Sequence, residues 1–303
     1  MSDGPPAYAE EDPNSPPPPP TATVLDVSDP QGADDLGGRV ARMQEVLGLP
    51  DELVRDLLKV SGRTEIVVVA DDSRSMNAVA DSEDARAPVT RWQELKRVSY
   101  ELVTMLLVVE SSEGFWLKFL NDDQFYHITR KEDLDPIFAS KPNAYGPSTP
   151  LQKSLRPILR KEKLLSENNR EERDSLCVVL TDGVPTDCSF AELADIVRSK
   201  PKNVYVSFVM CTDQLDVVTN YNHFMDPLPG TDVTDDYFSE RIEARNVGNE
   251  LTRFQWLAKM LLVKFEHFDH LDEKKVRKTR PSSTKMNHQP QPQPLPPACC
   301  LLS

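Results

Sequence analysis

The sequence predicts an α/β domain built on an open, doubly wound, mostly parallel sheet, with a disordered tail at each end. Apolar runs of strand length alternate with longer segments that have helical periodicity, which is typical of β-α-β connections. The first run, residues 65–70, is continuously apolar after Glu65 and mostly β-branched, as a strand buried on both faces requires. Residues 1–37 and 269–303 are rich in Pro or Gln and poor in large apolar side chains.

Between the tails, the pattern predicts elements in a regular order. Residues 38–60 have helical spacing on both sides of a Gly-Leu-Pro break, which predicts a helical hairpin packed on the main domain, 61–268. The predicted strands are 65–70, 115–120, 176–180 and 204–210, and the predicted helices are 90–110, 151–165, 190–198 and 251–263. Strands that alternate with helices imply right-handed crossovers and therefore parallel neighbours.

Two helix starts carry a capping box, in which each side chain bonds the other residue's backbone N–H. These pairs are Thr90 with Gln93 and Ser189 with Glu192. The acidic run 232–236 fits a sixth strand or a charged loop, with a second cation site as an alternative.

Composition narrows the function classes. The chain has 303 residues and a formal net charge of −14, and such an acidic chain repels phosphate backbones, so we expect no nucleic-acid partner. The N-terminus lacks the basic and apolar segments of a secretory signal, and no apolar stretch is long enough to span a membrane. Cys177 and Cys211 fall in or beside strands and are expected in the core.

Oxygen-bearing side chains follow the predicted strands at the edge where ligands bind in open α/β sheets. Asp71, Ser73 and Ser75 come directly after the first strand, Thr149 precedes a helix, and Asp182 follows the 176–180 strand. Carboxylate and hydroxyl oxygens suit a hard cation such as Mg²⁺ or Mn²⁺. The residues therefore predict a divalent-cation site.

These residues resemble the metal-ion-dependent adhesion site of the von Willebrand factor A family, with an Asp-x-Ser-x-Ser loop, a later Thr and a later Asp. The resemblance covers roughly residues 64–268. It implies that Ser73 and Ser75 bind the metal directly and that Asp71, Thr149 and Asp182 bind it directly or through water. It also implies that an acidic residue of a protein partner completes the metal's coordination.

Simpler interpretations of the same residues remain open. Ser73 and Ser75 occur commonly in turns, and Thr149 is a favourable N-cap before a Pro at the first helical position. Two features also depart from the family pattern. Arg74 stands where the family often has Gly and places a cation beside the site, and residues 77–89 lengthen the following loop.

The C-terminus, Cys-Leu-Leu-Ser, fits a prenylation box with Cys300 as the lipidated residue. A single lipid gives marginal attachment, so a second signal is expected. Palmitoylation of Cys299 and the basic cluster 274–280 are the candidates. The sequence thus predicts a cytoplasmic protein held at the cytoplasmic face of a membrane.

The N-terminal tail contains Pro5, Pro6 and Tyr8 in the spacing of a WW-domain ligand. His267 and His270 have the spacing of zinc ligands, although a solvated helix end is the simpler interpretation.

We therefore expect a non-enzymatic, Mg²⁺-dependent protein-binding module tethered to a membrane by lipid. A Mg²⁺-dependent hydrolase is one alternative, but the sequence shows no nucleophile loop and no Gly-rich phosphate loop. An adaptor that recruits WW-domain proteins through its N-terminal motif is the other.

Overall fold

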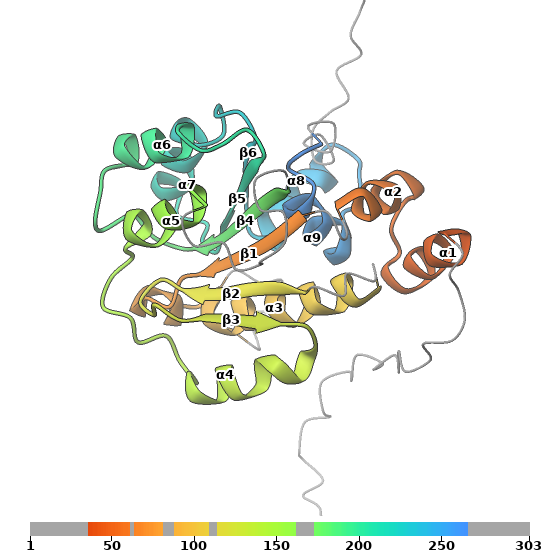
Figure 1. Ribbon diagram of the computed structural model, residues 1–303, viewed down its shortest axis with the longest axis horizontal. Coiled ribbons are helices and arrows are strands. Elements are labelled where there is room, and N and C mark those ends of the chain that lie inside the picture. Colours follow the sequence, from red (N-terminus) through yellow and green to blue (C-terminus); the bar gives the residue numbers. More distant parts are fainter. Residues whose placement is uncertain (1–35, 61–63, 81–87, 109–113, 162–172, 266–303) are drawn as a thin grey trace, which may run out of the picture.

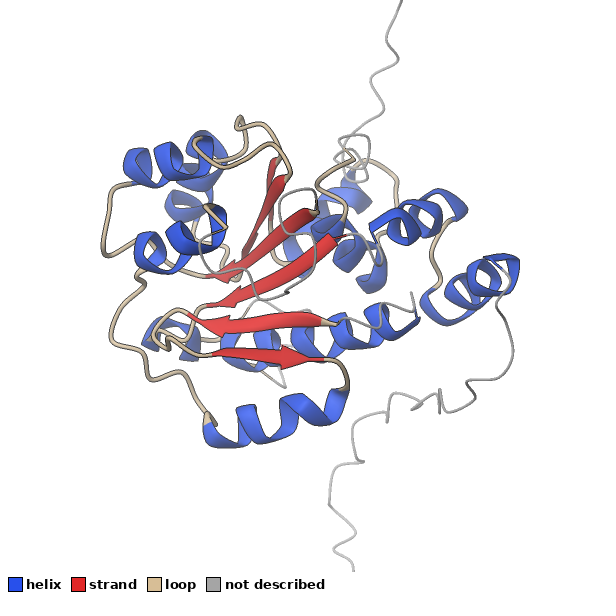
Figure 2. Cartoon of the chain, viewed as in Figure 1, coloured by secondary structure: helices blue, strands red, loops and turns tan. Residues whose placement is uncertain are grey.

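A computed structural model describes residues 36–60, 64–80, 88–108, 114–161 and 173–265. One six-stranded sheet organises them, in the order β3-β2-β1-β4-β5-β6. The strands are β1 (Thr64–Ala70), β2 (Phe115–Phe119), β3 (Phe125–Ile128), β4 (Asp174–Thr181), β5 (Val204–Met210) and β6 (Thr231–Thr234). All neighbouring pairs are parallel except β2 with β3, which confirms the predicted mostly parallel α/β fold (Figures 1 and 2).

Helices cover both faces of the sheet. The longer ones are α1 (Leu36–Leu47), α2 (Asp51–Val60), α3 (Arg91–Val108), α7 (Leu215–Phe224) and α8 (Tyr237–Asn246). The shorter ones are α4 (Leu134–Ser140), α5 (Leu151–Leu159), α6 (Phe190–Arg198) and α9 (Arg253–Leu261), with 3₁₀ turns at Arg74–Asn77 and Lys131–Asp133. Among the described residues, no helix is long and apolar enough to cross a membrane.

The core is divided by the sheet into two apolar clusters. Strand β1 contributes to both, because successive side chains point to opposite faces. Ile66 and Val68 join the cluster that holds α1, α2, α3, α4 and α9, and Val67 and Val69 join the one that holds α5, α6 and α7. Burial on both faces explains why β1 is continuously apolar from Ile66 to Ala70.

Several elements were not predicted, and they are short or bury few side chains. Strand β3 is a short edge strand whose side chains are mostly half-exposed, and its place in the sheet is fixed by antiparallel pairing with β2. Helices α4, α7 and α8 each contribute few buried side chains. The acidic run 232–236 supplies most of β6, as one of the two simpler interpretations predicted.

The predicted capping boxes at Thr90 and Ser189 are both present. The expectation that Thr149 caps α5 is wrong, since no side chain of the preceding residues caps that helix. Asp187, from the loop after β4, accepts hydrogen bonds from the backbone N–H groups of Gln152 (3.1 Å) and Lys153 (2.8 Å). A distant carboxylate therefore supplies the cap.

Asp187→Ala is expected to destabilise the chain by about 1 kcal/mol, because it removes the acceptor for two N–H groups of α5. In metal-free buffer, Thr149→Ala should carry no capping cost. Urea unfolding of both variants with chelator present measures the difference. A larger loss of unfolding free energy for Thr149→Ala than for Asp187→Ala would contradict the assignment of Asp187 as the cap.

The chain places β2 and β3 on one side of β1 and then returns to place β4, β5 and β6 on the other side. The loops that follow β1 and β4 therefore leave the same edge of the sheet at the switch point, where a crevice forms in open α/β sheets. All the predicted metal-site residues lie in or next to loops at this edge.

Candidate metal centre

A chain of hydrogen bonds joins four of the five predicted site residues. The backbone N–H of Ser73 donates to Asp71 Oδ1 at 2.8 Å, and the hydroxyls of Ser73 and Ser75 lie 2.9 Å apart. Ser75 Oγ donates to Asp182 Oδ1 at 2.8 Å. Residues separated by more than a hundred positions in the sequence are thus in direct contact at the ends of β1 and β4.

Thr149 reaches the same place through the loop that follows Asp182. Its backbone N–H donates to Thr186 Oγ1 at 3.1 Å, and its carbonyl accepts from Thr186 N at 3.0 Å. A Cβ added to Gly183 would stand 3.3 Å from Thr149 Oγ1. The Thr149 hydroxyl therefore lies against the backbone next to Asp182.

Gly146 allows the loop before Thr149 to approach the first loop closely. Gly146 N donates to Asp72 O at 2.7 Å, and Gly146 O accepts from Arg74 N at 3.1 Å. A Cβ at this position would meet Asp72 O at 2.7 Å, so only glycine permits this contact.

Asp72, beside the predicted ligand Asp71, supports the site instead of joining it. Its Oδ1 accepts from Asn121 N (3.0 Å) and Asn121 Nδ2 (2.8 Å), and the same Nδ2 donates to Ser148 O at 2.8 Å. Asn121 follows β2 and was not predicted as a functional residue. Its contacts link three loops at this edge of the sheet.

Asp71 is fully buried, and this burial raises its pKa to about 6. Hydrogen bonds from Ser73 and from Thr181, whose Oγ1 donates to Asp71 Oδ2 at 2.6 Å, oppose the shift, and the negative charge of Asp182 adds to it. Thr181 was also missed, because a Thr at the end of a strand carries no distinctive sequence signal. A cation would remove the cost of ionising Asp71.

The structure places a second cation, Arg91, at the site, in addition to Arg74 between the two serines. Arg74 is exposed. Arg91 begins α3, is 7% exposed, and donates from Nη1 to Asp182 Oδ2 at 2.8 Å. An Arg in the first turn of an amphipathic helix is usually solvated, so the sequence pattern did not single it out.

The geometry fits a small divalent cation. Adjacent ligands of an octahedral Mg²⁺, each about 2.1 Å from the metal, lie about 3 Å apart. The spacings of 2.9 Å between Ser73 Oγ and Ser75 Oγ and of 2.8 Å between Ser75 Oγ and Asp182 Oδ1 are those of hydrogen bonds, and they are also compatible with this value. In the described part of the chain, no three His, Cys, Asp or Glu side chains cluster as a metal site, so the donor set here depends on hydroxyls.

Neither predicted core cysteine offers a nucleophile near the site. Cys177 is buried in β4, and burial raises its pKa to about 12. Cys211 follows β5 and is half-buried against the core and not within it; desolvation there, together with nearby carboxylates, Asp182 first among them, raises its pKa well above the ordinary value. Both thiols therefore stay protonated near neutral pH.

Several predicted features lie outside the described residues. These are the N-terminal motif with Pro5, Pro6 and Tyr8, the histidines His267 and His270, the basic cluster 274–280, and Cys299 and Cys300. Residues 81–87 of the lengthened loop also fall outside.

Comparisons with known proteins give a structural match only. No family model matches the sequence, and no curated protein does. Among solved structures, the crystal structure of the SpRpn10 VWA domain matches with a TM-score of 0.41 and 9% sequence identity, over 65% of this chain and 93% of that chain. The assignment of the fold rests on the strand order and pairing of this chain itself.

Proposed function

We propose that this chain is a non-enzymatic, Mg²⁺-dependent protein-binding module. The observation that carries the proposal is the meeting of hydroxyl and carboxylate oxygens from three separate loops at the switch point of the sheet. Serines that only formed turns would not need to meet a carboxylate from another loop. The buried Asp71, with its raised pKa, gains most from a bound cation.

Ser73 and Ser75 would hold the ion directly, and Asp71, Thr149 and Asp182 would hold it directly or through water. When bound, Mg²⁺ (or Mn²⁺) supplies a Lewis-acidic position for a carboxylate of the partner. Arg91 binds Asp182 Oδ2, whereas Asp182 Oδ1 faces Ser75. The ion pair therefore leaves Oδ1 available as a ligand of the metal.

Exposed apolar side chains on neighbouring loops support a protein as the ligand. Val79 follows the first loop, Tyr145 precedes Gly146, Val184 follows Asp182 and Leu215 follows β5, and their exposed fractions run from 49% to 78%. Large apolar side chains left in water around a site suit contact with a protein surface. A partner that presents an acidic residue among apolar ones suits this edge.

The C-terminal Cys300, with Cys299 and the cluster 274–280, would tether the module to the cytoplasmic face of a membrane. Pro5, Pro6 and Tyr8 would recruit a WW-domain protein as a separate function. In a eukaryotic cell, Cys300→Ser should move the protein from the membrane fraction to the cytosol. Absence of a prenyl adduct on the wild-type chain by mass spectrometry would contradict the tether.

Affinity capture with the full chain tests the binding function. Partners should be recovered with Mg²⁺ and lost both with chelator and with Asp71→Ala, because each removes the position that takes the partner's carboxylate. Asp195→Ala, an exposed carboxylate on α6, is the matched control and should behave as wild type. Capture that is indifferent to chelator and to Asp71→Ala would refute metal-dependent binding. Phosphoester turnover lost in Asp71→Ala would instead favour a hydrolase.

A further inference from the structure

The Arg91–Asp182 ion pair has no role in the function proposed above, yet it is built into the candidate metal centre. The side chains of Arg91 and Asp182 are 8% and 0% exposed, and their closest atoms are 2.8 Å apart. Two charges buried to this extent lose most of their hydration, so each depends on the other for compensation.

The backbone fixes Arg91 against the loop that carries the serines. Arg91 N donates to Ala78 O at 2.9 Å, and Ala78 N donates to Ser75 O at 2.9 Å. The start of α3 is therefore attached to the end of the loop that follows β1. Its guanidinium reaches Asp182 at the end of β4, so Arg91 links the two loops of the site.

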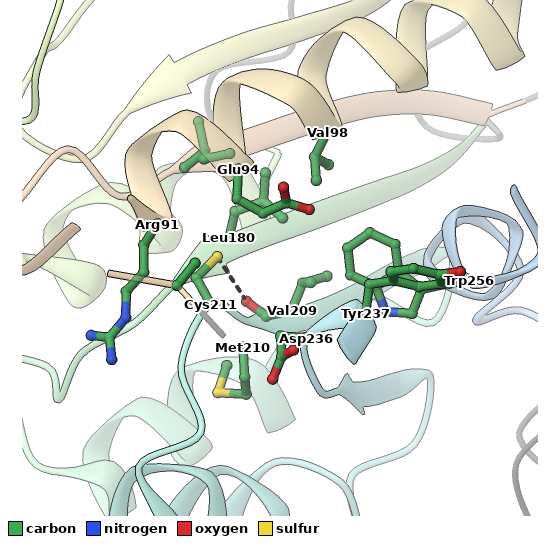
Figure 3. Close-up of a pocket in the computed structure, with 12 residues that line it drawn as sticks. Arg91, Glu94, Val98, Leu180, Val209, Met210, Cys211, Asp236, Tyr237 and Trp256 are labelled. Carbon is green, nitrogen blue, oxygen red and sulfur yellow. Dashed lines mark hydrogen bonds between the residues drawn. The ribbon is translucent and has the colours of Figure 1, made fainter. Parts of the chain in front are cut away.

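The hydrogen-bonding groups of Asp182 are better satisfied than those of Arg91. The carboxylate accepts from both Ser75 and Arg91, whereas the buried Arg91 Nε has no hydrogen-bond partner. In Figure 3 the guanidinium points away from the apolar wall formed by Tyr237 and Trp256. The hydrogen bonds around the pair are therefore concentrated on the carboxylate of Asp182.

We propose that Arg91 is an internal counter-ion of the metal centre, which neutralises Asp182 when no divalent cation is bound and thereby lowers the affinity of the site for Mg²⁺. The inference rests on the proposed function. With Asp71 and Asp182 both ionised, the two carboxylates carry −2, and Arg91 reduces the charge that a cation meets to −1. A doubly charged ion a few ångströms from a guanidinium is repelled by an amount that corresponds to at least about tenfold in affinity.

A purely structural ion pair would share one property with this counter-ion. In both cases Arg91→Met should lower the metal-free melting temperature, because Asp182 is left buried and uncompensated. Only the counter-ion predicts that the same substitution strengthens Mg²⁺ binding. The affinity for Mg²⁺ therefore separates the two roles.

The experiment compares the full-length wild type with Arg91→Met and Arg91→Lys, using calorimetric titration with MgCl₂ and melting curves with and without the ion. Arg91→Met should melt lower than wild type without metal, bind Mg²⁺ at least about tenfold more tightly, and show the larger melting shift on Mg²⁺ addition. Arg91→Lys keeps the charge and should bind Mg²⁺ within about threefold of wild type. Equal or weaker binding by Arg91→Met, with wild type still responding, would overturn the counter-ion and leave the metal site standing.

Two other outcomes are also decisive. If neither wild type nor Arg91→Met responds to Mg²⁺, the proposed metal-dependent function fails and the counter-ion with it. A response by Arg91→Met alone would support the counter-ion and contradict Mg²⁺ binding by the natural chain.

If Arg91→Met does not fold, Asp182→Asn is added to it. The uncharged pair should fold again if Arg91 serves to neutralise Asp182, and continued failure to fold would overturn that role.

Discussion

Asp71→Ala is expected to abolish the rise in melting temperature that Mg²⁺ gives the wild-type chain. A ligand that binds only the folded state at a hundred times its Kd stabilises that state by about 2.7 kcal/mol, and this increment disappears when a ligand of the metal is removed. Without metal, the variant should be close to wild type in stability. It loses two hydrogen bonds, but it also loses a carboxylate whose burial opposes ionisation.

Asp71→Asn is the matched variant, since it keeps the volume of the side chain and removes only the charge. It should lose the Mg²⁺ response as Asp71→Ala does. In wild type the response should weaken as the pH falls through about 6, because a proton on Asp71 then competes with the cation. Differential scanning calorimetry of the three chains with and without MgCl₂ provides the measurement. An unchanged Mg²⁺ shift in both variants would exclude Asp71 as a ligand.

Glu240→Ala is expected to destabilise the chain by about 3–5 kcal/mol, because it removes the carboxylate that pairs with the buried charge of Lys259. Glu240 on α8 is 3% exposed and accepts from Lys259 Nζ on α9 at 3.1 Å, and Lys259 is 6% exposed. Glu240 also accepts from Asp235 N at 3.1 Å, so the same substitution loosens the start of α8. Urea unfolding measures the loss.

Glu243→Ala provides the control for this loss, since Glu243 lies on the same helix and is exposed. It should stay within about 0.5 kcal/mol of wild type. Replacing Glu240 and Lys259 together by Met should recover most of the stability, as apolar groups of similar volume carry no desolvation cost. Equal effects of Glu240→Ala and Glu243→Ala would show that the pair contributes little.

The sequence alone was sufficient for features that depend on neighbouring residues. The continuous apolar run of β1, the helical period of α3 and the capping boxes at Thr90 and Ser189 are local patterns, and each has one favourable structure. The positions of Asp71 and Asp182 at strand ends followed from the same patterns. Parallel strands bring their carboxyl ends to one edge, so the meeting of these loops was predictable before the fold was known.

Metal binding, lipidation of Cys300 and the WW-domain motif remain predictions from the sequence. The structure brings the oxygens of Ser73, Ser75 and Asp182 together through hydrogen bonds, a spacing that is also compatible with Mg²⁺ ligands.

Only the tertiary structure decided which distant residues contact Asp71 and Asp182 and which residue caps α5. Arg91 meets Asp182 across 91 positions, Thr181 meets Asp71 across 110, and Asp187 caps a helix that begins 36 residues earlier. No local period encodes such contacts, because they depend on the strand order that brings β1 beside β4. Strand β3 has the same origin, since four residues are too few for a decisive local pattern and the place of β3 in the sheet comes from its pairing with β2.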